Sequence, residues 1–269
     1  MRRGRTERVL VERYDEGVPS RLPDEVVVEE PLEIRLDGHL VATTMRTPGN
    51  DYELAVGFCI SDGLLGGASV LSVRYCGQGP AAESEYNVVT VETGGLAPIP
   101  EARIGTVSSS CGVCGTSALT EIATRIAPIN VDVTFQSSMI CELVKSVSEK
   151  QEMYGRTGGL HAAAVFDING EIELLREDIG RHNAVDKVVG RRFLDGITNS
   201  NERGLFVTSR ASFEMVQKAW AAGFGTLVAA SAPSALAIEA ARTSGITLVG
   251  FAREHSMNVY SGELRDTIE

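Results

Sequence analysis

The chain has 269 residues, of which 43% are hydrophobic, enough for one large or two medium soluble domains, and we expect two. The formal net charge of −11 argues against a nucleic-acid partner, because nucleic-acid binding needs a basic face. No apolar stretch is long enough to cross a bilayer, and the arginine-rich N-terminus lacks the apolar core of a signal peptide. We therefore expect a cytoplasmic protein without a membrane partner.

The first predicted domain covers residues 24–103 and combines strands with one helix. Alternating apolar and polar residues flank Asp37 and Gly38, a dipeptide favoured in two-residue turns, and predict a β-hairpin. The segment 47–51 can begin a helix over residues 52–61. Residues 70–75 and 86–92 alternate as two further strands, which completes a small α+β domain.

The second predicted segment, residues 104–127, is a linker that carries Cys111 and Cys114. Small and polar residues surround both thiols, so neither is expected to be buried. Apolar residues recur at helical spacing from residue 115 to residue 126. The amide end of such a helix would favour a thiolate at Cys114.

Several kinds of site contain a cysteine pair of this spacing. A structural zinc site needs four ligands, and the remaining cysteines, Cys59, Cys76 and Cys141, are single and scattered, so we expect no metal. A structural disulfide does not suit a reducing compartment. A thioredoxin-like pair follows a strand, which the serines before Cys111 do not resemble. The pair therefore predicts a reactive cysteine that carries a group covalently, with the second sulfur assisting or resolving.

The third predicted segment, residues 128–269, is an α/β domain. We expect a helix over residues 138–154, a hairpin of strands 160–166 and 171–176, and a helix over residues 183–193. Apolar strands then alternate with helices, at 204–208, 213–222, 226–231, 234–243 and 246–252. This alternation predicts a mostly parallel sheet covered by helices.

Polar residues follow each of the three last strands. Ser209, Arg210 and Ser212 come after the first, Ser231 and Ser234 after the second, and Arg253, Glu254, His255 and Ser256 after the third. Hydroxyls and free amides at helix starts, with arginines nearby, are suited to hold phosphate, although Ser212 and Ser234 could simply cap their helices. The charge-rich segment 176–187 could line a pocket or be a solvated helix start. We expect His161 to be a core histidine.

Five segments together resemble the formate dehydrogenase accessory sulfurtransferase family, FdhD/NarQ. They are Pro48-Gly49-Asn50-Asp51, Ser110-Cys111-Gly112-Val113-Cys114-Gly115, Gly158-Gly159-Leu160-His161-Ala162-Ala163, the segment 176–187, and Ser209-Arg210-Ala211-Ser212-Phe213-Glu214. The resemblance covers nearly the whole chain in order. It implies that the C-terminal domain has a three-layer fold similar to that of cytidine deaminase.

The same resemblance implies a sulfurtransferase that accepts sulfur from a cysteine desulfurase as a persulfide. Cys111 would bear that sulfur, with Cys114 as its partner. The sulfur would pass to the molybdenum cofactor in its bis-guanine-dinucleotide form, which GDP or GMP could mimic, before insertion into the formate dehydrogenase catalytic subunit. The cofactor-binding segment would fall on Phe251, Ala252, Arg253, Glu254, His255 and Ser256.

Two other functions remain open from the sequence. One is a noncatalytic chaperone that binds the molybdenum cofactor, and the other is a zinc-binding deaminase-like hydrolase. The histidine-x-glutamate motif of the zinc deaminases is absent, because His161 is followed by two alanines. The small apolar residues of segment 235–241 also lead us to expect a homodimer.

Overall fold

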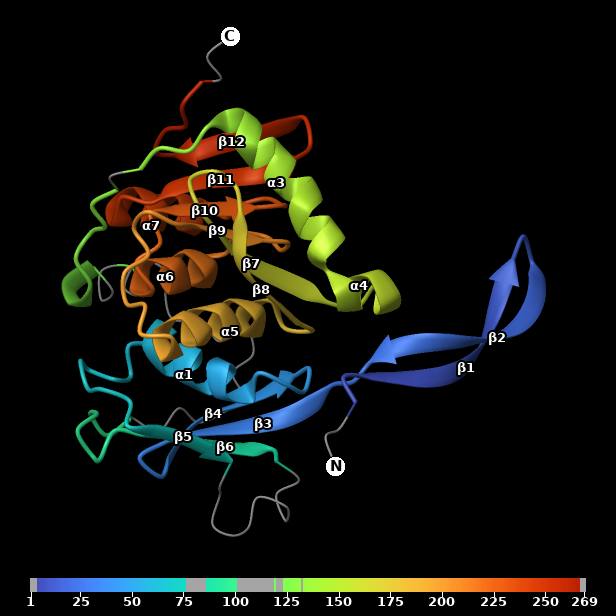
Figure 1. Cartoon of the computed structure of the whole chain (residues 1–269), viewed down its shortest axis with the longest axis horizontal. Coiled ribbons are helices and arrows are strands. Elements are labelled where there is room, and N and C mark those ends of the chain that lie inside the picture. The colour runs from blue at the N-terminus through green and yellow to red at the C-terminus, as the bar shows by residue number, and fades with distance from the viewer. Residues whose placement is uncertain (1–3, 76–85, 101–118, 120–122, 132, 267–269) are drawn as a thin grey trace.

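The computed structural model describes residues 4–75, 86–100, 119, 123–131 and 133–266. Figure 1 shows a body built from two units stacked on one another, with a two-stranded arm that projects from one side. None of the helices in the described ranges is both long and apolar enough to cross a membrane.

The arm consists of strands β1 (Thr6–Asp15) and β2 (Val18–Val27), which pair antiparallel as a sheet of their own. Glu16 and Gly17 form the turn at its tip with φ of 48° and 85°, as two-residue hairpin turns require. The predicted start of the first domain, residue 24, falls inside β2. No strand was predicted for residues 6–23.

The N-terminal unit is a four-stranded sheet with one helix on it. The strands are β3 (Glu30–Leu36), β4 (His39–Arg46), β5 (Ser72–Tyr75) and β6 (Val88–Glu92), in the order β4-β3-β6-β5. Asp37 and Gly38 form the expected turn between β3 and β4. Helix α1 (Asp51–Ser61) buries Leu54, Phe58 and Cys59 against this sheet. The predicted hairpin, helix and later strands are confirmed.

The C-terminal unit has three layers around a six-stranded sheet of order β12-β11-β10-β9-β7-β8. Its strands are β7 (His161–Phe166), β8 (Ile172–Asp178), β9 (Gly204–Val207), β10 (Thr226–Ala229), β11 (Thr247–Arg253) and β12 (Ser256–Ser261). The predicted parallel pairing of β9, β10 and β11 is confirmed. The sheet as a whole is mixed, because β7 and β12 run against the other four strands.

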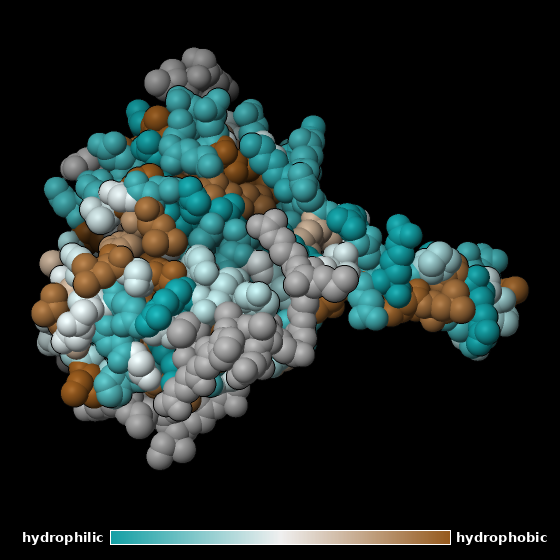
Figure 2. All heavy atoms as spheres, turned by 60° about the horizontal axis from the view of Figure 1, so that its bottom comes forward, coloured by the Kyte–Doolittle hydropathy of each residue, from teal (hydrophilic) through white to brown (hydrophobic). Residues whose placement is uncertain are grey.

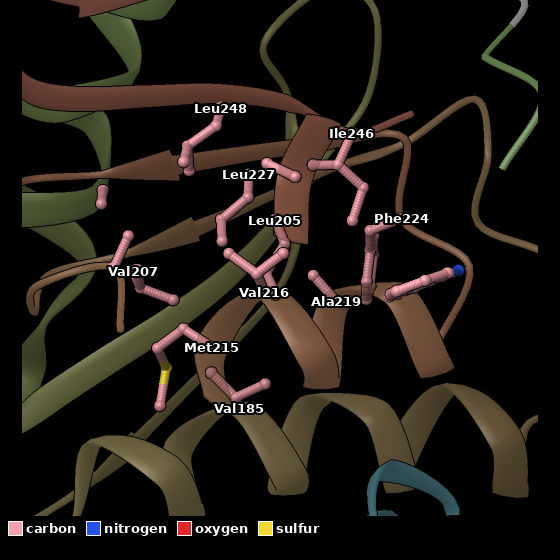
Figure 3. Close-up of a cluster of buried hydrophobic side chains, with 14 of the residues drawn as sticks. Val185, Leu205, Val207, Met215, Val216, Ala219, Phe224, Leu227, Ile246 and Leu248 are labelled. Carbon is pink, nitrogen blue, oxygen red and sulfur yellow. The ribbon is translucent and has the colours of Figure 1, made fainter. Parts of the chain in front are cut away.

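Helices cover both faces of this sheet. On one face lie α5 (Arg181–Leu194), α6 (Phe213–Ala221) and α7 (Ala235–Ser244), whose apolar residues share one core with alternate residues of the strands (Figure 3). On the other face α3 (Ser137–Lys150) packs on the opposite set of strand residues. The predicted helix 138–154 is broken at Gln151, after which α4 (Glu152–Thr157) begins.

Two glycines bring the two units into direct contact. Helices α1 and α5 cross at Gly57 and Gly190, where a Cβ on Gly57 would lie 1.8 Å from the carbonyl oxygen of Asp186. A Cβ on Gly190 would come equally close to the carbonyl oxygen of Glu53, at 1.8 Å. Only glycine permits backbones to approach this closely, so the crossing fixes the N-terminal unit beneath α5.

Candidate functional site at the carboxyl edge of the sheet

The three loops that follow β9, β10 and β11 lie side by side at one edge of the sheet. The Ala211 amide donates to the Ala232 carbonyl at 3.2 Å, and the Ser234 amide donates to the Ala211 carbonyl at 3.0 Å. The Phe251 amide donates to the Ser231 carbonyl at 3.2 Å. The structure therefore brings together the three predicted loops, at the position where sheets of this class bind ligands.

The first of these loops carries Ser209, Arg210 and Ser212. Ser209 is buried and its hydroxyl donates to the carbonyl of Arg210 at 3.1 Å, whereas the Arg210 side chain is exposed. Ser212 occupies the N-cap position of α6, but its hydroxyl donates to Glu214 at 2.8 Å and accepts no backbone amide. Ser234, by contrast, caps α7 by accepting from the Ala237 amide at 3.2 Å. The Glu214 carboxylate, in the first turn of α6, accepts from its own backbone amide, so an acidic side chain already faces this end of the helix.

The end of β11, the turn after it and the start of β12 carry the segment that the family resemblance points to. Phe251 adopts a φ of 50°, which is an outlier for a bulky residue, and its ring is 42% exposed. A register shift between Gly250 and Arg253 accompanies it. Ala252 is buried, and Glu254, His255 and Ser256 are exposed. Strained backbone of this kind concentrates at ligand sites, and here it holds an aromatic ring out into solvent.

Arg253 supports the loop beside it. Its guanidinium donates to the carbonyl of Ala230, at the end of β10, and to its own neighbour Ala252 at 2.9 Å. Arg253 is exposed at the same time, so part of the guanidinium remains accessible. Arg210 and Arg253 therefore place two positive charges on an edge that belongs to an otherwise acidic chain.

Two histidines extend this edge toward β7. His161 begins β7 on the same face as Ala163 and Val165, which is the face that α5 and α6 cover. Burial, followed by the nearby Arg181 and His182, lowers the pKa of His161. His182 Nε2 lies 3.6 Å from Glu214 Oε2, which is too far for a hydrogen bond, and is buried without a hydrogen-bond partner. The expectation that His161 is a core residue is wrong, because it is only half-buried at the rim of the sheet.

His182 also lowers the pKa of Glu214. The imidazole is the largest influence on the pKa of Glu214, which it and the Ser212 hydroxyl lower to about 2 against the opposing effect of burial. The sequence showed His182 only as one member of a charge-rich segment. Its neighbour Glu214 comes from another helix, 32 residues further along the chain.

Asp178 fixes the start of α5 onto the N-terminal unit. Its carboxylate accepts from the backbone amide of Thr47 at 3.1 Å, from the Gly180 amide at 2.8 Å and from Asn183 Nδ2 at 3.0 Å. Lys187 Nζ lies 2.6 Å from the same carboxylate, and both side chains are fully buried. At Asp178 and Lys187 the segment 176–187 is therefore a buried contact between the units, whereas Arg176 and Glu177 at its start line a cavity.

Two cavities among the described residues lie elsewhere. One of about 490 Å³ is lined by Arg5, Asn50, the end of α3, the start of α4 and the edge strand β8. Another of about 380 Å³ lies beside Gln136 and Arg265. Neither is lined by the predicted cofactor residues.

Cys111 and Cys114 lie outside the described residues. Leu119, five positions after Cys114, is helical and buried in the core shared with α5, α6 and α7, and residues 123–125 are helical as predicted. Cys59 is fully buried, and burial raises the pKa of its thiol to about 12, so it is a packing residue. Within the ranges given above, no cluster of histidine, cysteine or carboxylate side chains could hold a metal ion.

The fold defines a three-layer α/β protein whose sheet edge carries polar loops, joined through α1 and α5 to a smaller α+β unit. The FdhD/NarQ family model matches residues 27–266, and the chain belongs to that family. It is 47% identical to the sulfur carrier protein FdhD of Streptomyces avermitilis, with 97% of this chain and 95% of the relative covered. It is 45% identical to the protein of the same name from Streptomyces coelicolor, with 96% and 94% covered.

The fold is also similar to a crystal structure named as that of a formate dehydrogenase accessory protein from Desulfotalea psychrophila. The TM-score is 0.75 at 24% sequence identity, and the similarity covers 96% of this chain and 98% of the other. The family resemblance and the fold class predicted from the sequence are both confirmed.

Proposed function

We propose that this protein is a cytoplasmic sulfurtransferase that takes sulfur from a cysteine desulfurase and delivers it to the molybdenum cofactor before insertion into formate dehydrogenase. The names of its relatives, sulfur carrier and formate dehydrogenase accessory protein, support this role. The cysteine pair at residues 111 and 114 supplies the chemistry. The observation that carries the cofactor part of the proposal is the joined set of loops around Phe251 at the carboxyl edge of the sheet.

Sulfur loading is an exchange between thiols. The Cys111 thiolate attacks the outer sulfur of the desulfurase persulfide, one sulfur–sulfur bond breaks, another forms, and the donor cysteine leaves as its thiolate. No electrons are gained or lost overall. For release, the Cys114 thiolate attacks the inner sulfur on Cys111, and the outer sulfur leaves as sulfide toward the metal. The resulting disulfide then needs a dithiol reductant to return to the starting state.

The guanine nucleotide ends of the cofactor suit the edge described above. The exposed ring of Phe251 can stack on a base, while the arginines Arg210 and Arg253 favour phosphate. GDP and GMP are therefore suitable probes. The chain's own residues would bind and orient the cofactor, and the cofactor itself is the substrate that receives sulfur.

Mass spectrometry tests the loading step directly. After incubation with a cysteine desulfurase and cysteine, we expect the peptide that contains Cys111 to gain the mass of one sulfur atom. Cys111→Ala abolishes this gain, whereas the matched variant Cys141→Ala, at a partly exposed cysteine elsewhere, retains it. If the wild-type protein binds GDP and supports formate dehydrogenase activity without gaining sulfur, it is a noncatalytic chaperone instead.

Nucleotide titration tests the cofactor edge. Phe251→Ala removes the stacking surface and should weaken GDP binding about tenfold, since stacking on one base contributes about 1–3 kcal/mol. Phe251→Tyr keeps the ring and should keep the affinity. Val259→Ala is the control, because Val259 is equally exposed, at 44%, on the neighbouring strand β12. An affinity for GDP that is the same in all four proteins would place the nucleotide elsewhere.

A further inference from the structure

The arm formed by β1 and β2 has exposed apolar residues and one open edge. Leu10, Tyr14 and Val18 are exposed by 67%, 65% and 67%, and Figure 2 shows apolar residues along the arm. Among the described residues, no third strand pairs with either β1 or β2. A two-stranded ribbon in water is marginally stable by itself. An arm of two ten-residue strands is therefore expected to pack against, or pair with, another polypeptide segment.

The two outer edges of the arm differ in their capacity to pair. The Val28 amide donates to the Arg5 carbonyl at 2.9 Å, which shows that odd-numbered residues of β1 direct their backbone groups toward β2. The even-numbered residues of β1, including Leu10, therefore direct theirs outward. On β2 the outward positions include Pro19 and Pro23, which lie opposite Tyr14 and Leu10 and have no N–H to donate. Only the β1 edge is open.

The sequence of β1 is complementary to itself. When two copies are aligned antiparallel about Leu10, Glu7 faces the partner's Arg13 and Arg8 faces the partner's Glu12. Val9 faces the partner's Val11 in the same alignment. Moving the centre by one residue destroys the match, since Leu10 then faces either the partner's Glu12 or the partner's Arg8. Opposite charges and apolar pairs directly across a ladder are the arrangement that stabilises antiparallel strands.

We propose that β1 pairs antiparallel with β1 of a second copy of this chain, centred on Leu10, to give a four-stranded ribbon in the order β2-β1-β1-β2. The occupant is a second copy because the edge matches its own sequence in charge and in apolar positions. A two-fold interface of this kind uses the same patch on both subunits. The inference does not depend on the sulfur chemistry proposed above.

The base of the arm is consistent with the same alignment. Arg5 is only partly buried there, and its Nη2 donates weakly to the Glu177 carbonyl at 3.4 Å. In the alignment centred on Leu10, the partner's Asp15 falls opposite Arg5. The tip of one arm would then bring a carboxylate near the guanidinium at the base of the other.

Sedimentation velocity on the full chain across a dilution series tests this pairing. The wild type should be a dimer. Glu7→Arg places like charges opposite each other twice in the dimer and should raise the dissociation constant about tenfold or more. Within its own arm Glu7 faces only Val26, so the arm itself should be unaffected. The double variant Glu7→Arg/Arg13→Glu restores opposite charges and should restore the dimer.

Glu29→Arg is the control, because it makes the same charge change at an exposed position outside the arm and should leave the dimer intact. A monomeric wild type overturns the proposal. So does a dimer that Glu7→Arg leaves unchanged, or one that the double variant fails to restore. A protein that dimerises as expected but gains no sulfur leaves this inference standing and refutes the proposed sulfur loading alone.

Discussion

The buried ion pair between Lys187 and Asp178 is a contact whose loss should strongly reduce the stability of the protein. Lys187 Nζ also donates to the Thr47 carbonyl at 3.0 Å, so the amine links α5, β8 and the N-terminal unit. Lys187→Met keeps the length of the side chain and leaves the carboxylate buried without its counter-charge. Removing one partner of a buried pair costs about 3–5 kcal/mol.

The lower end of that range is expected here. Three donors to Asp178 remain in the variant, namely the amides of Thr47 and Gly180 and the side chain of Asn183. We therefore expect the free energy of unfolding to fall by about 3 kcal/mol, out of a total of about 5–15 kcal/mol for a typical domain.

Urea titration followed by tryptophan fluorescence is a direct assay, because the chain has one tryptophan, Trp220, which is 2% exposed in the core of the C-terminal unit. Lys145→Met is the control at a lysine that is 67% exposed, and should change the stability by less than about 0.5 kcal/mol. Adding Asp178→Asn to Lys187→Met removes the uncompensated charge and should recover part of the loss.

Two results would refute this reasoning. One is a loss below about 1 kcal/mol in Lys187→Met, which is the contribution of an ordinary hydrogen bond and not that of a buried charge pair. The other is a double variant no more stable than Lys187→Met, which would show that the buried carboxylate is not the source of the instability.

Three further predictions concern acid stability, thiol reactivity and helix packing. Because the pKa of Glu214 is lowered to about 2 from 4.5, its contribution is present above pH 4.5 and lost as the pH falls toward 2. Glu214→Gln should therefore lower the free energy of unfolding at pH 7 but not at pH 2. The loss at pH 7 should not exceed about 1 kcal/mol, because the carboxylate is 42% exposed. An equal loss of stability at both pH values would contradict this prediction. Cys59 should resist maleimide in the native protein and react only after denaturation, as peptide mapping would show, since burial raises its pKa to about 12. Gly57→Ala should destabilise the protein by about 3 kcal/mol or more in urea, whereas Gly155→Ala, whose Cβ meets nothing within 4 Å, should not; similar losses in both would refute the close crossing.

Local sequence patterns were sufficient for most of the C-terminal unit. After residue 204, apolar strands alternate with helices. Strand–helix–strand connections of this kind are nearly always right-handed and make the strands parallel, so the pattern predicted both the parallel pairing and the sheet edge at which the loops meet. The same logic placed Ser212 and Arg253 on one edge. The strained backbone at Phe251 could not be foreseen, since a positive φ in a bulky residue is imposed by its surroundings and not by its own preference.

The arm and the buried ion pair were missed for a different reason. Residues 6–27 have charged and apolar side chains on both faces, so no face is consistently buried and the usual strand pattern is absent. Asp178 and Lys187 looked like solvated charges because their environment depends on Thr47, which is more than 130 residues away. Contacts between residues so far apart in the sequence depend on the tertiary fold and cannot be read from local sequence patterns.

The prolines at positions 19 and 23 have a consequence for how many molecules can associate. A ribbon able to hydrogen-bond along both margins could recruit copy after copy and grow into a filament. Here one margin lacks two of its donors, so addition through the other margin stops once a single neighbour has been engaged. The chain thus combines an edge strand that can pair with a built-in limit on pairing, which prevents an acidic molecule from polymerising without end.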